Sequence, residues 1–417
     1  MKNTTSAKPL YAWLVVALLW IVAFLNYLDR ILITSMRDPI VADFNLTDAQ
    51  FGLLTSVFLW SYGILSPFGG FFADRYSRKK VIVFSVMVWS LVTLWTGFAG
   101  SFYEMLVARV LMGVSEACYI PAALALITDY HKGKTRSLAT GLHMSGLYAG
   151  LALGGLGGYI AELWGWRSGF HVFGIVGIAY SLILLYVLRD HKSDVPEGAG
   201  DEPASTEQIS LIGALKVLFT ESSFFILLFY FAILGMVNWL VYGWLPTFLK
   251  DHFNLNLGEA GISATGYIQI GSFIGVILGG ILADRWTRKN KKGRLYVLII
   301  GFTLGAPFLF LMASTNIFNI AIMAMLVFGL ARGFNDANLM PILRQVADGR
   351  YIATGYGFLN FLSTIVGGLM VYVGGALKDA KIDLSVIYQI SAVAMLIATW
   401  SLFVIKIKKN INQTDEN

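Results

Sequence analysis

Residues 69–79 read Gly-Gly-Phe-Phe-Ala-Asp-Arg-Tyr-Ser-Arg-Lys, and residues 279–289 read Gly-Gly-Ile-Leu-Ala-Asp-Arg-Trp-Thr-Arg-Lys. In both places an apolar run ends on two glycines and is followed by an Asp-Arg pair and further basic residues. A pattern that returns in the same surroundings indicates a chain built from two similar halves. The apolar runs around the two copies then decide what kind of halves these are.

The composition is that of a membrane protein. Of 417 residues, 57% are hydrophobic and only 13% are charged, whereas soluble domains carry about a quarter charged residues. Apolar runs recur from Tyr11 to Ile407, which excludes a soluble fold and a receptor with one membrane span. Cys118 is the only cysteine, so an intrachain disulfide and a cysteine-based metal cluster are excluded. We expect the first apolar run to be a retained helix and not a signal peptide, because no small-residue cleavage site follows it.

Twelve segments are long and apolar enough to cross a bilayer, which takes about 20 residues. They are residues 11–36, 49–73, 81–101, 103–128, 137–161, 169–188, 223–250, 258–283, 295–314, 317–346, 351–377 and 385–407. We therefore predict an all-α integral membrane fold of twelve transmembrane helices, arranged as two six-helix bundles with pseudo-two-fold symmetry.

The predicted bundles comprise residues 1–188 and 223–417, and residues 189–222 form a polar linker between them. Leucines at helical spacing, Leu211, Leu215 and Leu218, predict a short surface helix within this linker. Lys and Arg residues concentrate in the loops at 75–80, 132–136 and 285–294. Because short cytoplasmic loops collect positive charge, we expect both termini to be cytoplasmic. The net charge of +6 then follows from topology, and no nucleic-acid partner is needed to explain it.

The repeated pattern resembles the signature of the Major Facilitator Superfamily, a family of membrane transporters. The resemblance implies that the basic residues latch the cytoplasmic ends of the two bundles, while the glycines permit close helix contact. It assigns a gating role to Gly70, Asp74, Arg75, Arg78, Gly280, Asp284, Arg285 and Arg288. Solvated positive loops are the alternative explanation of the basic members.

Two further stretches resemble one branch of that superfamily, the anion:cation symporters, which include sugar-acid and sialic-acid-type permeases. These are Asn26-Tyr27-Leu28-Asp29-Arg30 and the group of Arg109, Gly113, Glu116-Ala117 and Pro121. The same stretches are also similar to the spinster-type lipid transporters. They do not separate the two branches.

Charged residues inside the predicted helices indicate a functional site, because each costs about 2.5–3.5 kcal/mol at a helix centre. Asp29 and Arg30 are adjacent, so they point about 100° apart and face different neighbours. Arg109 and Glu116 are seven positions apart and share one helix face. We interpret Asp29 and Glu116 as proton sites, Arg109 as the residue that neutralises either of them, and Arg30 as free to bind an anionic substrate. Static ion pairs that only fix the packing remain the alternative.

Other polar and aromatic residues are expected to line the substrate path: Tyr27, Asn238, Trp239, Tyr242, Asn335 and Asn360. Packing against neighbouring helices or anchoring at the membrane interface is the alternative for the aromatic residues. Arg332 and Asp336 lie four positions apart and can bond each other directly. We assign them no role in coupling.

The sequence thus favours a proton-coupled symporter for a small organic anion, such as a sugar acid or a sialic-acid-like monocarboxylate. The alternative is a spinster-type transporter of lysolipids or sphingolipids. We expect a monomer in the bilayer of a bacterial cytoplasmic (inner) membrane, with protons as coupling ion and no metal or other cofactor. An enzyme is not expected, because no catalytic constellation is apparent. The sequence also lacks a glycine-rich nucleotide-binding loop that ends in Gly-Lys-Ser or Gly-Lys-Thr, since Gly133-Lys134-Thr135 has Thr128 where that loop requires its first glycine, and this argues against ATP-driven transport.

Overall fold

The computed structural model describes residues 9–190, 211–347 and 351–407, and helices make up all the regular structure in these ranges. The first half contains α1 (Pro9–Leu32), α2 (Arg37–Phe44), α3 (Asp48–Arg75), α4 (Arg78–Phe98), α5 (Phe102–Glu116), α6 (Tyr119–Tyr130), α7 (Arg136–Leu153), α8 (Gly157–Trp164) and α9 (Trp166–Val187). After the short α10 (Leu211–Thr220), the second half contains α11 (Ser222–Phe253), α12 (Leu257–Thr287), α13 (Gly293–Ser314), α14 (Phe318–Val346), α15 (Ile352–Asp379) and α16 (Leu384–Ser401).

Eleven helical stretches in the described ranges have the length and apolar composition needed to cross a membrane. They correspond to eleven of the twelve predicted segments. The remaining segment, residues 137–161, is divided into α7 and α8 by the 3₁₀ turn Gly154–Leu156. Glycine is a poor helix former, and these glycines lie where the second half packs closely, because a Cβ on Gly155 would meet the backbone of Gly261.

A second predicted segment, residues 103–128, is also interrupted. Its two parts, α5 and α6, are separated by a turn at Ala117 and Cys118. Pro121 has no amide hydrogen, so it cannot donate to the carbonyl of Ala117 as a continuous helix requires. The interruption follows immediately after Glu116, so this acidic side chain lies at the end of α5.

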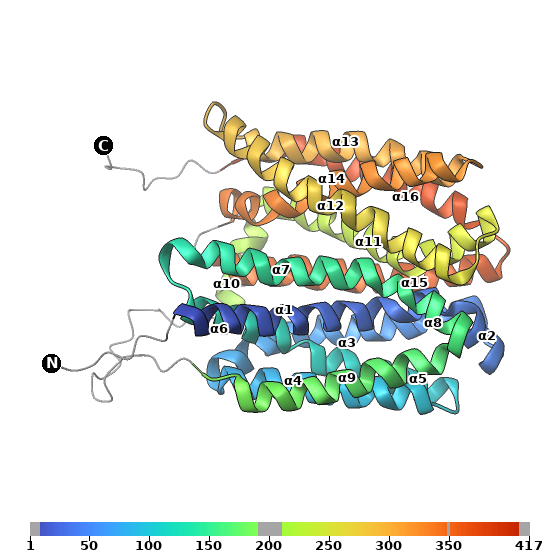
Figure 1. Ribbon diagram of the computed structural model, residues 1–417. Helices are drawn as coiled ribbons and strands as arrows, with labels where there is room; N and C mark the ends of the chain where they lie inside the picture. The colour runs from blue at the N-terminus through green and yellow to red at the C-terminus, as the bar shows by residue number, and fades with distance from the viewer. Residues whose placement is uncertain (1–8, 191–210, 348–350, 408–417) are drawn as a thin grey trace.

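The helices of each half pack mainly on one another, and Figure 1 shows them roughly parallel, with the first half below the second. In the first half, α1 packs on α7, and α4 packs on α5 and α9. In the second half, α12 packs on α14, and α11 packs on α15. The most extensive contacts between the halves are those of α3 along α15 and of α7 and α8 along α12.

The contacts between the halves concentrate toward one end of the molecule, which we call the α2 end; the other end, where α10 lies, is the α10 end (Figure 1). Near the α2 end, both carboxylate oxygens of Asp379 accept hydrogen bonds, from the backbone amides of Asp48 and Ala49 at 2.8 and 2.9 Å. Glu162 accepts one from the amide of Leu257 at 2.6 Å. Toward the α10 end, a Cβ on Gly141 of α7 or on Gly357 of α15 would meet nothing within 4 Å.

A cluster of ion pairs also joins the halves at the α2 end. Arg37 pairs with both Asp38 and Asp48, and the second half contributes Lys250, whose Nζ lies 2.7 Å from Asp38, and Lys378, whose Nζ lies 3.3 Å from Asp48. Burial raises the pKa of Asp38, but the hydrogen bond and charge of Lys250, together with Arg37, outweigh it and hold this pKa below its usual value.

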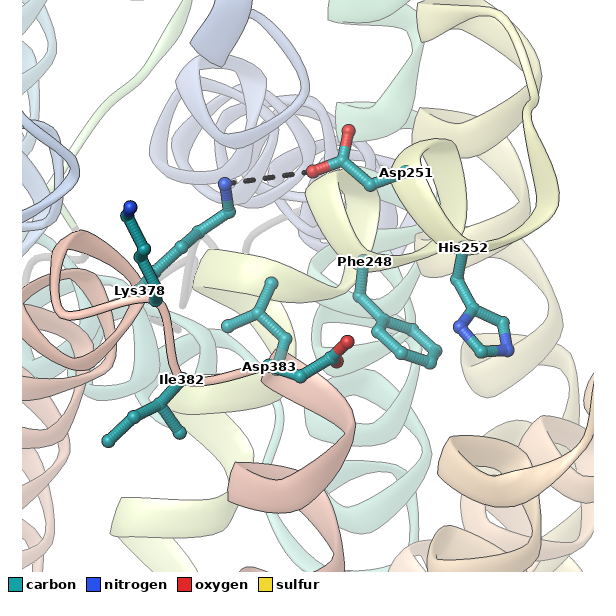
Figure 2. Close-up of a pocket in the computed structure, with 8 residues that line it drawn as sticks. Phe248, Asp251, His252, Lys378, Ile382 and Asp383 are labelled. Carbon is teal, nitrogen blue, oxygen red and sulfur yellow. Dashed lines mark ion pairs between the residues drawn. The ribbon is translucent and has the colours of Figure 1, made fainter.

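Beside this cluster lies a cavity of about 420 Å³ lined by Phe248, Asp251, His252, Lys378 and Asp383, among others. Figure 2 shows it, with the ion pair between Lys378 and Asp251, 3.7 Å long, at its rim. The lining residues belong to the α2 end of the second half, so this cavity is separate from the charged residues predicted in the membrane.

Candidate functional site

The centre of the first half holds a buried ion pair between α1 and α5. The Nε of Arg30 lies 2.6 Å from Oε2 of Glu116, and both side chains are almost fully buried, at 2% and 0% exposed. Neither residue therefore points into lipid. We predicted that Arg30 is free and that Arg109 neutralises Glu116. In the structure Arg30 is the partner of Glu116 instead.

Only part of the hydrogen-bonding capacity of this ion pair is used. Nη2 of Arg30 and Oε1 of Glu116 have no hydrogen-bond partner among the described residues. Aromatic rings surround the guanidinium instead, with its Cζ 4.5 Å from the ring centre of Tyr27 and 4.3 Å from that of Tyr62. Aromatic faces attract a cation but leave its N–H groups available, so Arg30 retains donors for a further anion.

Asp29 and Arg109 lie beside this pair without joining it. Asp29 accepts one long hydrogen bond, 3.4 Å from the hydroxyl of Thr93, and its Oδ1 has no partner in the described part of the chain. Arg109 is fully buried and donates to the carbonyl of Leu54 at 3.3 Å and to the sulfur of Met112 at 3.2 Å. In this conformation Arg109 therefore makes no ion pair with either acid, unlike the arrangement predicted from its shared face with Glu116.

The second half carries its own polar group around Tyr242 of α11. The hydroxyl of Tyr242 accepts hydrogen bonds from Nε2 of Gln269, at 2.9 Å, and from Nη1 of Arg332. The Cζ of Arg332 lies 4.8 Å from the Tyr242 ring centre. Nε of Arg332 and Oε1 of Gln269 are buried and have no partner within the described ranges.

Asp336 is not bonded to Arg332, although one helical turn separates them. Its carboxylate accepts from Nδ2 of Asn335 at 3.1 Å and from the hydroxyl of Tyr148 at 3.0 Å. Asn335 in turn accepts from Tyr230 at 2.9 Å. Because Tyr148 lies on α7 and Asp336 on α14, this hydrogen bond joins the two halves.

An aromatic cluster lies where the two halves meet. Tyr27 of α1 and Trp239 of α11 both pack against the buried group of Ile31, Leu151 and Tyr242. The rings of Trp239 and Tyr242 are 5.8 Å apart. Three of the predicted lining residues thus come together. Asn335 of α14 is buried and contacts Tyr230 and Asp336 instead. Asn238 and Asn360 are partly buried, and the structure places them in none of these contacts.

The predicted gating residues make their ion pairs within each half. Arg78 pairs with Asp129 of α6, and Asp284 pairs with Arg294 of α13. Arg75, Arg285 and Arg288 are exposed, and Gly280 would meet nothing within 4 Å if it carried a Cβ. The surroundings of Gly70 and Asp74 lie outside what the structure describes. The latch between halves that the motif implies is therefore not formed by these pairs in this conformation.

Tyr148 and Gln269 were not predicted as members of the site, and Arg332 was assigned no role in coupling. Each was visible as a polar side chain within an apolar run. The sequence does not show how α7, α12 and α14 are oriented about their own axes. This orientation directs the three side chains toward the polar groups described above.

The model of the Major Facilitator Superfamily matches residues 19–371. The chain belongs to the Major Facilitator Superfamily. Among its curated relatives is the D-galactonate transporter of Escherichia coli O6:H1, 27% identical over 94% of this chain and 95% of that one. Spinster homologue 1 of Xenopus tropicalis is also 27% identical, over 71% of this chain, and the match spans only 59% of that relative.

The fold of this superfamily member is similar to a solved structure of a bacterial homologue of the human lysosomal transporter spinster, in an inward-facing and unoccupied conformation. The TM-score is 0.75 at 23% identity, and the match covers 95% of this chain and 96% of the other. At this identity the similarity describes the fold.

Proposed function

We propose that the protein is a secondary transporter that moves a small organic anion together with a proton. The observation that carries the proposal is the buried pair of Arg30 and Glu116, in which the arginine keeps the unpartnered Nη2. A charged pair out of contact with water is costly unless its remaining groups are satisfied. A substrate carboxylate satisfies them, because it accepts charge-assisted hydrogen bonds from a guanidinium.

Coupling follows from competition for Arg30. While Glu116 is ionised, it occupies Nε of Arg30 at 2.6 Å, and a substrate carboxylate beside it meets a like charge. A proton on Glu116 removes that charge and releases the guanidinium, so proton and anion bind together and each favours the other. Asp29 is a second proton site in this proposal. Arg109, buried against the Phe58 ring, keeps the positive potential that returns the proton afterwards.

Alternating access supplies the movement. The halves touch at the α2 end through Asp379 and the ion-pair cluster, while the motif residues at the α10 end pair within their own halves. We infer that this conformation opens the site toward the α10 end, which the basic loops place on the cytoplasmic side. We further infer that the chain crosses the membrane twelve times, with α7 and α8 together forming the fifth crossing. In this proposal both termini are cytoplasmic and the membrane is a bacterial inner membrane.

The substrate class in this proposal is that of sugar acids. The D-galactonate transporter matches this chain over almost its full length, and the site offers a cation, tyrosine hydroxyls and the free amide oxygen of Gln269 to a polyhydroxylated carboxylate. Transport of a lipid is the second candidate, which the match to spinster homologue 1 favours.

Counterflow into proteoliposomes separates the two candidates. Vesicles loaded with unlabelled galactonate should take up labelled galactonate at a rate that excess lysophospholipid does not reduce. Purified protein should also unfold at a higher temperature with galactonate, because a ligand at 100 times its Kd adds about 2.7 kcal/mol to the state that binds it. Exchange of lysophospholipid without any exchange of sugar acids would overturn the proposal in favour of the lipid transporter.

A further inference from the structure

Arg332 lies inside a membrane-spanning helix, and its guanidinium has no acidic partner in the described part of the chain. Its Nη1 donates to the hydroxyl of Tyr242, a neutral group, and its buried Nε donates to nothing described. The nearest acid along α14, Asp336, is engaged by Tyr148 and Asn335. An unpaired charge at this depth is expensive, so it indicates a partner that the chain does not supply.

Comparison with Arg109 shows why Arg332 is the accessible one. Arg109 also makes no ion pair with a described residue, but its side chain is 0% exposed; its Nε and Nη1 donate to a carbonyl and a sulfur, and its Nη2 is enclosed without a partner. Arg332 is only partly buried. Part of the Arg332 side chain is therefore exposed, whereas Arg109 is fully enclosed.

Arg332 and Arg30 approach one aromatic cluster from opposite halves of the molecule. The Cζ of Arg30 lies 4.5 Å from the ring centre of Tyr27, and that of Arg332 lies 4.8 Å from the ring centre of Tyr242. Tyr27 and Tyr242 pack in one cluster. The two guanidiniums thus approach the same cluster, each against one of its tyrosine rings.

We propose that Arg332 is a second anion subsite and that the physiological substrate is a small dianion with an acidic group at each end, of the aldaric-acid class. One acidic group binds Arg30 and the other binds Arg332. Hydroxyl groups between them lie opposite Gln269, whose amide oxygen is unpartnered. This inference rests on the proposed function, since it uses Arg30 as the first subsite.

Such a ligand also has a mechanical consequence. Each of its ends neutralises one cation, and the two cations belong to different halves. A ligand that binds both halves favours conformations in which they lie close together around it, whereas a monoanion held by Arg30 alone has no such preference. The dianion should therefore bind more tightly than the monoanion of the same chain length.

The test compares galactarate, which has a carboxylate at each end, with galactonate, which has one. Binding of both is measured by calorimetry on the purified, full-length protein and on Arg332→Gln, Arg332→Lys and the matched control Arg344→Gln, which changes an exposed arginine near the end of the same helix. We expect Arg332→Gln to raise the Kd for galactarate by about tenfold or more, as loss of a charge-assisted contact does. The Kd for galactonate should change by less than about threefold in the same variant.

The remaining variants complete the comparison. Arg332→Lys should recover part of the galactarate affinity because it keeps the charge, and Arg344→Gln should bind both acids as the wild type does. Equal weakening of both acids by Arg332→Gln, or wild-type binding of galactarate that is no tighter than that of galactonate, would overturn the second subsite and leave the proposed function standing. If the wild type binds and transports neither acid, the proposed function fails, and the subsite with it.

Discussion

Glu116 is the residue on which coupling depends, because its carboxylate competes with substrate for Arg30. Replacing Glu116 by Gln mimics the protonated acid and frees the guanidinium permanently. We expect Glu116→Gln to bind galactonate with a Kd that no longer varies between pH 5 and pH 8, while the wild type binds more weakly as the pH rises. Calorimetry across that pH range measures both.

The matched control for this prediction is Glu104→Gln on the same helix. Glu104 lies at the start of α5 and accepts a hydrogen bond from the amide of Gly100, far from Arg30 in sequence and outside its contacts. Its substitution should leave the pH dependence of the wild type intact. A steep pH dependence that survives in Glu116→Gln would show that coupling runs through another acid, with Asp29 the next to test.

Arg30 carries the binding itself. Truncating one partner of a buried, charged hydrogen bond costs about 2–5 kcal/mol, so Arg30→Ala should weaken galactonate binding by at least about thirtyfold. Arg30→Lys should retain more affinity than Arg30→Ala because it keeps the charge, but it loses the bidentate hydrogen bonding of a guanidinium. A thermal-shift titration provides the measurement, and an unchanged shift in Arg30→Ala would place the substrate elsewhere.

The charged residues of the site could be predicted from the sequence, but their pairing could not. Asp29, Arg30, Arg109 and Glu116 were all recognisable because a charge inside an apolar helix needs a reason. The pairing depends on helix rotation and on side-chain rotamers, and neither leaves a pattern in the sequence. Because Arg109 and Glu116 share one helix face, we predicted that they interact, but Glu116 forms its ion pair with Arg30.

Among the elements, the broken helix of α7 and α8 packs most closely on the other half. A side chain at Gly155 would meet the backbone of Gly261 on α12, and backbone cannot move aside as a flexible side chain can. We expect Gly155→Leu to separate the halves at the α2 end and to abolish counterflow. Gly141→Leu, on the same α7 but with open space around its Cβ, should transport normally.

Spin labels provide the readout that distinguishes separation from unfolding. Cysteines placed at the exposed residues Ala42 and Ala380, in a background where Cys118 is Ser, report the distance across the α2 end. This distance should lengthen in Gly155→Leu and stay at the wild-type value in Gly141→Leu. An unchanged distance in Gly155→Leu would mean that this glycine contact does not hold the halves together.

The ion pairs of α2 add a pH dependence to stability. The pKa of Asp38 is held below its usual value, so the stability it contributes is present above the pKa of the unfolded chain, about 3.9, and is lost as the pH falls through the lower, folded value. Thermal unfolding followed from pH 6 down to pH 3 should show a decline below about pH 4. Asp38→Asn should be less stable at pH 6 and decline less steeply, and a parallel decline in both proteins would count against this contribution.

The elements themselves were largely predictable, because a bilayer demands long apolar runs and such runs are easy to recognise. The interruptions were less so. Pro121 was part of a motif and was not predicted to break the helix after Glu116, and residues 137–161 were predicted as one continuous helix. In both places the break follows from a local backbone property combined with a tertiary contact that the sequence does not reveal.

For the whole molecule, the repeated motif correctly indicated the superfamily, and the structure shows where the two halves touch in this conformation. The halves are held at the α2 end by Asp38, Lys250, Asp48 and Lys378, a cluster that sequence analysis did not anticipate. The repeated Asp-Arg motifs lie at the opposite end and pair within their own halves. In our account these two sets exchange roles as the protein rocks, so that one end is latched while the other is open.

The central claim, that a proton and an organic anion move together through the Arg30 and Glu116 site, is tested most directly by accumulation in proteoliposomes. With the interior at pH 7.5 and the exterior at pH 5.5, wild-type protein should concentrate labelled galactonate above its external level, and a protonophore should abolish the excess. Glu116→Gln should exchange galactonate in counterflow but never accumulate it. Wild-type uptake that only equilibrates and is indifferent to the protonophore, or accumulation by Glu116→Gln equal to that of the wild type, would contradict the account.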